Sequence, residues 1–474
     1  MLFNSFTFLI FFAAVMVVSR SMKSWTLRKS FLLLISYLFY AAWNPPFVIL
    51  LWISTLADWH LARAIHTSDS LRRRRLYLWA SLGINLGMLG YFKYANFFVN
   101  NLVALSQSLG LDWHPATMSI VLPVGISFYT FQTLSYTIDI YRRKATPWHC
   151  FLDYALYVTF FPQLVAGPIV RAVDFLPQCD EPKRASRKQF QWGLTLMIIG
   201  LFCKTAIADT LAPIVESVYD FQTAHSFVDA WAGTLAFSVQ IFCDFAGYST
   251  IAIGAALCLG FILPDNFHFP YAAIGFSDFW RRWHLSLSTW LRDYLYIPLG
   301  GSRCSKLKTY RNLALTMLLG GLWHGASWTF IVWGGLHGSY LVLEQLLRKW
   351  FAPQRLWASY PMQILLCALT FIAVCFAWVF FRARSFHAAG TMIASMTGQS
   401  SCASTLPTHH LLQVLLFTGV TLGVHWYSRN KTMEETFARL PGWLRGLILG
   451  AMVFAIFAEM TAQGAGNAFL YFQF

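Results

Sequence analysis

Two histidines in apolar, aromatic surroundings are the residues of this sequence best suited to chemistry. His324 lies in residues 318–325, a stretch of leucine, glycine and tryptophan that holds no other ionisable side chain. His284 lies in residues 279–301, FWRRWHLSLSTWLRDYLYIPLGG, where arginines and an aspartate stand among aromatic rings. We interpret the two segments as parts of one active site.

A neutral imidazole can act as a general base, accepting the proton of a hydroxyl group as its oxygen attacks an acyl carbon. An ionisable residue inside a membrane is costly and usually faces a cavity, a pathway or a partner. These considerations favour His324 as a catalytic base. A structural histidine, hydrogen-bonded between helices, fits the same residues, and the sequence leaves both interpretations open.

The charged residues near His284 also have two interpretations. Arg281, Arg282 and Arg292 have the geometry to bind the phosphates of an acyl donor. The alternative is that these arginines anchor a re-entrant helix to lipid headgroups, beside interfacial tryptophans. Asp244 is a carboxylate within an apolar segment, and we expect it to pair with a buried arginine or histidine.

Other kinds of site find no support in the residue spacing. The sequence has no H-x-x-x-H, H-x-E or C-x-x-C pattern, so we predict no metal site. The G-x-S-x-G pattern of a serine nucleophile is absent as well. His337 is predicted to be structural, and the nine cysteines are predicted to be small core residues.

The composition indicates an integral membrane protein. Of the 474 residues, 57% are hydrophobic and 12% are charged, whereas about 25% are charged in an ordinary soluble protein. A membrane-crossing helix needs about 20 apolar residues. Apolar segments near this length, some of them short or broken, recur at 2–19, 30–43, 46–62, 77–92, 119–139, 190–208, 231–262, 312–347, 363–381, 411–425 and 443–460.

No polar stretch between these segments is long enough to bury a core of its own, so we predict a single all-α, polytopic domain over residues 1–474. Its expected parts are N-terminal spans in 1–112, a catalytic core in 113–347 and C-terminal spans in 348–474. The first segment lacks a basic leader and is predicted to be a retained span. The net charge of +15 is attributed to cytoplasmic loops, not to nucleic-acid binding.

The basic residues predict the orientation, because they collect in cytoplasmic loops. Basic groups at 20–29, 72–75 and 142–144 alternate with loops of low charge, which places the N-terminus outside the cytoplasm. Residues 279–301 then reach in from the cytoplasmic side. His324 follows Arg311 by thirteen residues, which corresponds to roughly 20 Å of helix and a position near mid-membrane.

Residues 151–170 form an apolar segment with basic loops on both sides. The segment contains Pro162 and Pro168, and proline removes a backbone donor and breaks a helix. We therefore expect a re-entrant or interfacial element here. Non-helical backbone is tolerated at membrane depth only where it is buried in protein or lines a cavity.

With these residues in view, the chain resembles the membrane-bound O-acyltransferases, and within them the bacterial branch that O-acetylates alginate and other polysaccharides. In the stretch 244–250 this chain has Ala246 and Thr250 where the family has serine and aspartate. The segments that carry the resemblance are 122–129, 165–168, 279–301, 320–325, 378–383 and 471–474.

The resemblance implies that His324 is the essential histidine and that His284 is the second signature residue, at a central tunnel within a ring of helices. It also implies that acetyl-CoA donates the acyl group from the cytoplasm, with no bound cofactor. The residues expected to line the tunnel or contact substrate are Arg281, Arg282, Trp283, Ser288, Arg292, Asp293, Asp244 and Trp323.

The resulting hypothesis is a bacterial inner-membrane O-acetyltransferase that serves an exported exopolysaccharide. Expected partners are membrane lipid, a periplasmic SGNH or serine-hydrolase-like acetyltransferase, and a polysaccharide synthase and export complex. D-alanyl or peptidoglycan acylation is a runner-up with the same chemistry. A transporter or flippase that uses His324 for proton coupling is the alternative from another class, although no second copy of the 279–325 arrangement is present.

Overall fold

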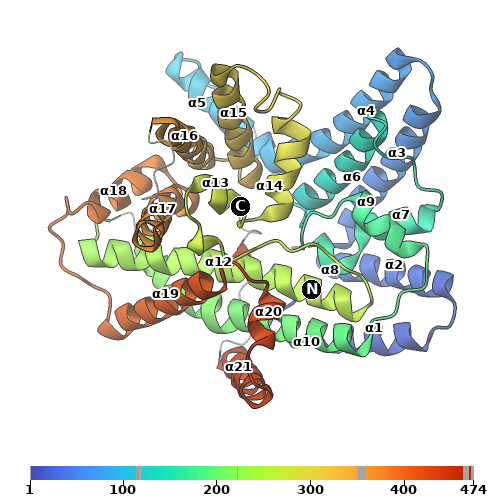
Figure 1. The fold of residues 1–474 in the computed structure, drawn as a ribbon. Coiled ribbons are helices and arrows are strands. Elements are labelled where there is room, and N and C mark those ends of the chain that lie inside the picture. Colours follow the sequence, from blue (N-terminus) through green and yellow to red (C-terminus); the bar gives the residue numbers. More distant parts are fainter. Residues whose placement is uncertain are drawn as a thin grey trace. The chain divides into compact units, whose positions relative to one another are not determined.

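The chain is helical in every regular element of the computed structural model within the described residues, which agrees with the predicted all-α class (Figure 1). It divides into two compact units. The N-terminal unit contains Met1–Leu194 and Ala252–Pro264, and the C-terminal unit contains Thr195–Ile251 and Asp265–Phe474. The single domain and its three segments stay predictions. The described residues are 2–113, 115, 120–165, 167–220, 223–350, 359–462 and 469–470.

The helices of the N-terminal unit are α1 (Phe6–Ser21), α2 (Trp25–Ala41), η1 (Pro45–Phe47), α3 (Val48–Thr67), α4 (Leu71–Leu89), η2 (Gly90–Tyr94), α5 (Ala95–Ser108), α6 (Ile126–Tyr141), α7 (Phe151–Thr159), α8 (Phe161–Leu164), α9 (Ala172–Phe175) and η3 (Leu176–Cys179). Two helices run through both units, namely α10 (Arg187–Phe202) and α12 (Phe227–Cys258).

The helices of the C-terminal unit are η4 (Cys203–Asp209), α11 (Thr210–Tyr219), η5 (Pro270–Ala272), α13 (Phe276–Trp280), α14 (Leu285–Leu291), η6 (Arg292–Tyr296), α15 (Lys306–His324), α16 (Trp328–Trp350), α17 (Tyr360–Arg382), α18 (Phe386–Met396), α19 (Thr408–Ser428), α20 (Met433–Ala438) and α21 (Gly442–Ala462).

Buried polar side chains join the helices of the N-terminal unit. Asp58 of α3 accepts hydrogen bonds from Ser81 and Asn85 of α4, and Asn85 also accepts one from Thr133 of α6. Lys29 of α2 forms an ion pair of 2.5 Å with Asp153 of α7. A polar group away from water must be bonded within the protein, so these contacts fix how the helices pack.

Lys29 and its neighbour Arg28 correct one step of the predicted orientation. Both residues were assigned to a basic loop, but they lie within α2 and are buried. Arg28 donates to the backbone oxygens of Lys183 and Leu259. Two of the basic residues at 20–29 are therefore internal anchors and do not contribute to a solvated cytoplasmic loop.

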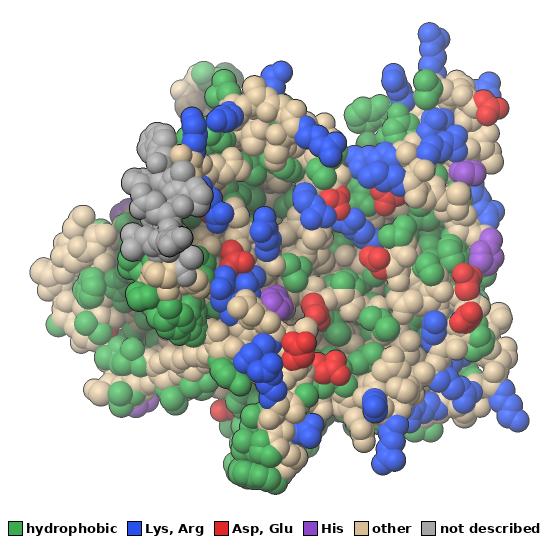
Figure 2. Space-filling view, in the orientation of Figure 1, with side chains coloured by type: hydrophobic (Ala, Val, Ile, Leu, Met, Phe, Trp, Pro, Cys, Tyr) green, Lys and Arg blue, Asp and Glu red, His purple; other side chains and the backbone are tan. Residues whose placement is uncertain are grey.

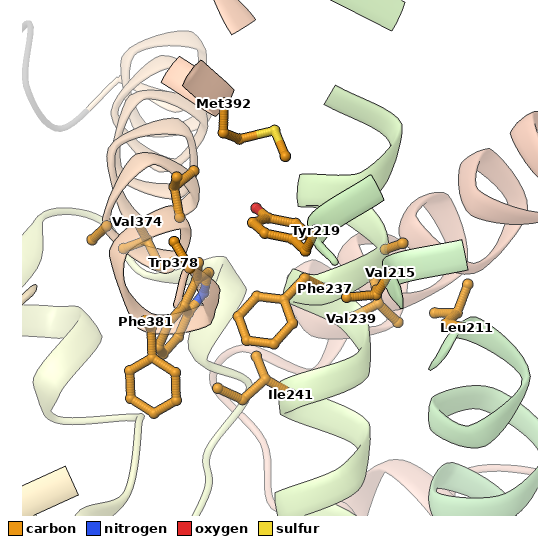
Figure 3. Packing of buried hydrophobic residues seen from close by; sticks show 14 of the residues in the cluster. Leu211, Val215, Tyr219, Phe237, Val239, Ile241, Val374, Trp378, Phe381 and Met392 are labelled. Atoms are coloured by element: carbon orange, nitrogen blue, oxygen red, sulfur yellow. The ribbon is translucent and has the colours of Figure 1, made fainter. Parts of the chain in front are cut away.

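Large apolar side chains from several helices form the core of the C-terminal unit. Figure 3 shows Tyr219 of α11, Phe237 of α12, Trp378 of α17 and Met392 of α18 packed near one another. Each is at least nine-tenths buried. Trp283 and Trp333 belong to the same cluster, so the residues next to the two candidate histidines are part of this core.

Among the described residues, six helical segments have the length and apolar composition to cross a membrane. Figures 1 and 2, drawn in one orientation, show α21 at the bottom with a hydrophobic surface, and its Trp443 and Phe454 are largely exposed. Such a surface suits contact with lipid chains. This is a multi-pass membrane protein. The six segments are Pro45–Thr67, Arg187–Tyr219, Phe227–Cys258, Tyr360–Arg382, Thr408–Ser428 and Gly442–Ala462.

The structure revises two predicted segments and agrees with a third. Residues 312–347 are not one helix, because α15 ends at His324 and α16 begins at Trp328. The predicted span 190–208 continues as a helix to Tyr219, so the loop that follows is shorter than expected. Residues 151–170 contain the short buried helices α7 and α8, which agrees with the break predicted at Pro162.

Candidate active site

Close packing of α15 against α16 sets the position of His324, the last residue of α15. A methyl group added at Gly321 would lie 2.2 Å from the backbone oxygen of Phe330, and one added at Gly334 would lie 2.2 Å from that of Met317. Only glycine fits at so close an approach of two backbones. The two glycines therefore let the helices meet, and the end of α15 places His324 in the core, where its exposed fraction is 3%.

His284 reaches the same place from a different segment. It is the N-cap of α14 and has φ of 45°, in the left-handed region that non-glycine residues seldom adopt. Its ring centroid lies 6.5 Å from that of His324 and 6.0 Å from that of Trp323. The structure thus brings the two predicted histidines together, 40 residues apart in sequence; their catalytic roles stay predictions.

Hydrogen bonds tie His284 to a residue that the sequence analysis missed. The Nδ1 atom of His284 lies 3.1 Å from the Oδ1 atom of Asn266, which also accepts bonds from the N–H and the hydroxyl of Ser286. Burial lowers the pKa of His284 to about 3, so its imidazole is neutral at physiological pH. A neutral, oriented imidazole is suited to accepting a proton.

Trp283 and Ser288 support this segment. Trp283 is fully buried and packs on Trp378 of α17, with ring centroids 5.0 Å apart. The Ser288 hydroxyl donates to the backbone oxygen of Trp283. Trp323, in turn, contacts the His324 ring at 5.0 Å. Of the predicted lining residues, Trp323 therefore lies beside both histidines, whereas the Ser288 hydroxyl bonds to the backbone of Trp283, the residue before His284.

The predicted arginines engage other groups. Arg282 pairs with Asp278 at 2.9 Å and donates to the backbone oxygen of Arg429, and Arg429 pairs with Asp278 as well. Burial alone would raise the pKa of Asp278, but hydrogen bonds from the Ile274 N–H and Arg429 and the charge of Arg282 lower it. In these contacts Arg282 joins α13 to the end of α19.

The two remaining arginines lie at the surface. Arg281 and Arg292 are exposed, and Arg292 pairs with its neighbour Asp293 at 2.7 Å. Arg282 thus contacts a carboxylate, backbone oxygens and the Nδ1 atom of His268, and Arg292 contacts a carboxylate. Binding of an acyl donor's phosphates by these arginines stays a prediction.

Asp244 pairs with a lysine, where the sequence analysis expected an arginine or histidine. Its Oδ1 atom lies 2.6 Å from the Nζ atom of Lys204, which is also 2.8 Å from Asp209. Lys204 falls in the π-helical turn η4, inside an apolar run, so its pairing was hidden in the sequence. Asp244 also accepts a hydrogen bond from the N–H of Leu470 near the C-terminus.

The residue after Asp244 links this ion pair to the candidate site. The ring of Phe245 meets that of His284 edge-on at 4.6 Å. Gly200 and Gly247 let the helix that carries Lys204 and the helix that carries Asp244 approach each other closely. A methyl group added at either glycine would lie within 2.7 Å of the backbone oxygen of the other. Asp244 therefore supports the wall of the site through Phe245.

His337 lies one ring away from His324. It is fully buried among aromatic side chains, with Trp333 at 4.8 Å and Trp280 at 5.1 Å, and Trp333 also contacts His324 at 4.9 Å. Within the described part of the chain, neither ring nitrogen of His337 has a hydrogen-bond partner. The structural role predicted for His337 stays a prediction.

The described residues form an apolar groove and one group of side chains that could hold a metal ion. A largely apolar groove of about 300 Å³ lies between α17 and α19 and ends on Tyr271, and none of the predicted lining residues borders it. One trio that could hold a metal occurs among the described residues, His149, Asp153 and Asp180 in the N-terminal unit. Asp153 already pairs with Lys29 there.

Known proteins resemble this chain over most of its length. A probable alginate O-acetylase of Pseudomonas putida is 42% identical over 401 residues, which is 84% of this chain and 80% of the relative. A peptidoglycan O-acetyltransferase of Helicobacter pylori is 38% identical over 429 residues, with the same coverage of both chains. A teichoic acid D-alanyltransferase of Bacillus subtilis is 27% identical over 293 residues, 58% of this chain and 72% of the relative.

The family comparison agrees with these similarities. The profile of the membrane-bound O-acyltransferases matches residues 142–389, which include both histidines, Asn266 and Asp244. The terminal residues 471–474, part of the resemblance drawn from the sequence, lie outside the described residues. The resemblance is confirmed: this chain belongs to the membrane-bound O-acyltransferase family and is a membrane O-acyltransferase.

Proposed function

We propose that this chain moves an acetyl group from cytoplasmic acetyl-CoA to an acceptor outside the cytoplasm, for O-acetylation of an exported polysaccharide. The observation that carries the proposal is the 42% identity to a probable alginate O-acetylase over 84% of the chain. The peptidoglycan relative is named for O-acetyl transfer too, whereas the D-alanyl relative is less similar, at 27%.

The juxtaposed imidazoles supply the chemistry. His324 would act as the base, taking the proton of the acceptor hydroxyl while the hydroxyl oxygen bonds to the thioester carbonyl carbon. The carbon–sulfur bond then breaks, and the proton passes to the departing thiolate. Direct attack by a hydroxyl and relay through an acylated histidine are both compatible with a base at this position. The buried, aromatic surroundings of His324 would keep water from competing for the acyl group.

The direction of transfer follows from the basic loops. Exposed Arg72 and Arg73 and the basic residues at 142–144 support a cytoplasmic position for those loops and a periplasmic N-terminus. In a bacterial inner membrane, the donor would then enter from the side of residues 279–301. The acceptor would approach from the periplasm.

The acceptor is proposed to be a partner protein and not the polymer itself. By resemblance, a periplasmic SGNH or serine-hydrolase-like transferase would take the acetyl group and pass it on, next to a polysaccharide synthase and export complex. No nucleic-acid partner is proposed, because the basic residues are assigned to membrane topology.

Peptidoglycan is the second candidate polymer. It is favoured by the 38% identity to a peptidoglycan O-acetyltransferase over 84% of the chain. The two polymers are distinguished by measuring ester-linked acetate separately in exopolysaccharide and in cell wall from cells with and without this chain. Acetate lost from the exopolysaccharide alone supports the main proposal, and loss from the wall alone supports the alternative.

The catalytic assignment is tested in the same cells with His324→Ala. We expect this variant to insert in the membrane at the wild-type level and to leave the polymer without acetyl esters. His387→Ala, which removes an exposed histidine of the same unit, is the matched control and should retain acetylation. Wild-type acetyl content in the His324→Ala strain would reject His324 as the base.

A further inference from the structure

Asn266 lies against the candidate histidine His284 and is almost entirely buried, with an exposed fraction of 1%. Its Oδ1 atom is the meeting point of three polar contacts. The Nδ1 atom of His284 lies 3.1 Å away, the N–H of Ser286 donates at 3.3 Å, and the hydroxyl of Ser286 donates at 2.9 Å.

The Ser286 N–H identifies which end of the Asn266 amide occupies this position. A backbone N–H can only donate, and an amide nitrogen cannot accept, so the oxygen of Asn266 must face Ser286. The Nδ2 atom of Asn266 has no hydrogen-bond partner among the described residues, so no contact of that nitrogen favours the flipped orientation. The donors at Oδ1 therefore set the orientation of the amide.

An oxygen acceptor at 3.1 Å determines where His284 carries its proton. A neutral imidazole has one protonated nitrogen and one with a lone pair, and only the protonated nitrogen can bond to a carbonyl oxygen. The proton is therefore on Nδ1 and the lone pair on Nε2. Burial holds the pKa of His284 at about 3, so the ring is neutral at physiological pH and this choice applies there.

The backbone around the two residues keeps them in register. The Leu285 N–H donates to the backbone oxygen of Asn266, and the His268 N–H donates to that of Arg282, both at 2.9 Å. His284 itself is held at a left-handed φ of 45° between these bonds. Residues 266–268 and 282–285 thus form one frame, in which the amide can turn away only by losing its hydrogen bonds to His284 and Ser286.

We propose that Asn266 is a positioning residue that holds His284 in the tautomer with the proton on Nδ1 and the lone pair on Nε2. Its relevance to acyl transfer rests on the proposed function. In this tautomer His284 meets the reacting groups as an acceptor. It can accept a hydrogen bond from the acceptor hydroxyl or from a protonated His324, and it cannot donate from Nε2 to a thioester carbonyl.

The groups that face His284 come from two other helices. α12 presents the Phe245 ring at 4.6 Å, and α15 presents Trp323 at 6.0 Å and His324 at 6.5 Å. His324 is a titratable group in ring contact with His284. A charge introduced at Asn266 would therefore act on these two imidazoles, with His284 the nearer.

The tautomer is measured by ¹⁵N NMR on the full-length protein with labelled histidines, in which the His284→Gln spectrum identifies the His284 signals. We expect a protonated Nδ1 and an unprotonated Nε2 in the wild type. Asn266→Leu, of similar volume but without the acceptor, should lose that pattern. Asn312→Leu replaces another buried asparagine of the same unit and is the control, which should leave the His284 signals unchanged.

A wild-type spectrum with the proton on Nε2, or with both nitrogens protonated at neutral pH, would overturn the proposal. An unchanged His284 pattern in folded Asn266→Leu would overturn it as well. Because the spectrum needs no turnover, this test is independent of whether the protein transfers acetyl groups. Failure of the proposed function is recognised separately, as a wild-type protein that leaves acetyl-CoA intact.

Asn266→Asp gives a second readout that does not depend on tolerance of leucine. The aspartate keeps the oxygen acceptor but adds a negative charge, which favours a protonated His284 and raises its pKa. Acetyl transfer should be near the wild-type rate at high pH and fall about tenfold for each unit below the raised pKa. A pH profile that superimposes on the wild type would contradict the role of Asn266.

Discussion

Replacing Gly321 with alanine tests how closely α15 and α16 must approach for His324 to work. The added methyl group would lie 2.2 Å from the Phe330 backbone oxygen and within 3.1 Å of Gly334. Ordinary carbon contacts begin near 3.4 Å, so the helices must separate locally by about 1.2 Å. Backbone atoms line both sides, and no side-chain rotation can absorb this shift.

The expected cost of that shift is larger in activity than in stability. Overpacking of this kind destabilises a protein by about 1–3 kcal/mol. A misplacement of about 1 Å at a reacting group can cost about a hundredfold in rate. Since His324 is three residues from Gly321 and ends the same helix, we expect Gly321→Ala to transfer acetyl groups about a hundredfold more slowly while remaining folded.

Gly320→Ala is the matched control, one residue away on the same helix. Among the described residues, the methyl group there would meet only the Cδ1 atom of Leu291 at 3.2 Å, at the free end of a flexible side chain. Alanine also favours helix over glycine by about 1 kcal/mol. The rate of acetyl transfer by this variant should stay within about threefold of the wild-type rate. A threefold change is a smaller change in the activation barrier than the roughly 1.4 kcal/mol that corresponds to a tenfold change in rate. Initial rates of acetyl-CoA consumption and thermal unfolding in detergent measure both effects. Equal rates for the two variants would refute the packing argument.

Two other predictions concern buried charges. Lys204→Met should destabilise the protein by about 3–5 kcal/mol in thermal unfolding, because Asp209 and Asp244 lose their shared cation; a loss below about 1 kcal/mol, the scale of an exposed pair, would contradict this. The pKa of Asp278 is lowered in the folded state, so its stabilisation is present above its unfolded pKa and is lost as pH falls through the folded value. Asp278→Asn should therefore show a shallower fall in melting temperature below about pH 4, and an unchanged acid limb would count against the assignment.

The residue pattern singled out His324, because a lone ionisable group in an apolar stretch needs a reason. It pointed to His284 through the arginines and the aspartate that stand with it among aromatic rings. The family resemblance carried by the surrounding segments was confirmed as well. The meeting of His284 with His324 could be expected from that resemblance. It could not be derived from spacing, because a left-handed residue and a helix turn produce it.

What the sequence missed involves partners that lie far apart in the chain. Lys204 lies inside an apolar span, and its ion pair with Asp244 depends on the close approach of Gly200 and Gly247. Asn266 stands in a loop, and only the folded backbone brings its amide to His284. A clue was available for Asn266, since it precedes an aromatic segment that leads into residues 279–301.

The central claim is that His324 takes part directly in transferring an acetyl group from acetyl-CoA. The most direct measurement uses the purified protein in lipid nanodiscs with acetyl-labelled acetyl-CoA and an added acceptor, comparing wild type with His324→Ala. The account predicts release of CoA and appearance of labelled ester with the wild type, and neither with folded His324→Ala. Intact thioester in the presence of wild-type protein and acceptor, or equal ester formation by the two proteins, would contradict it.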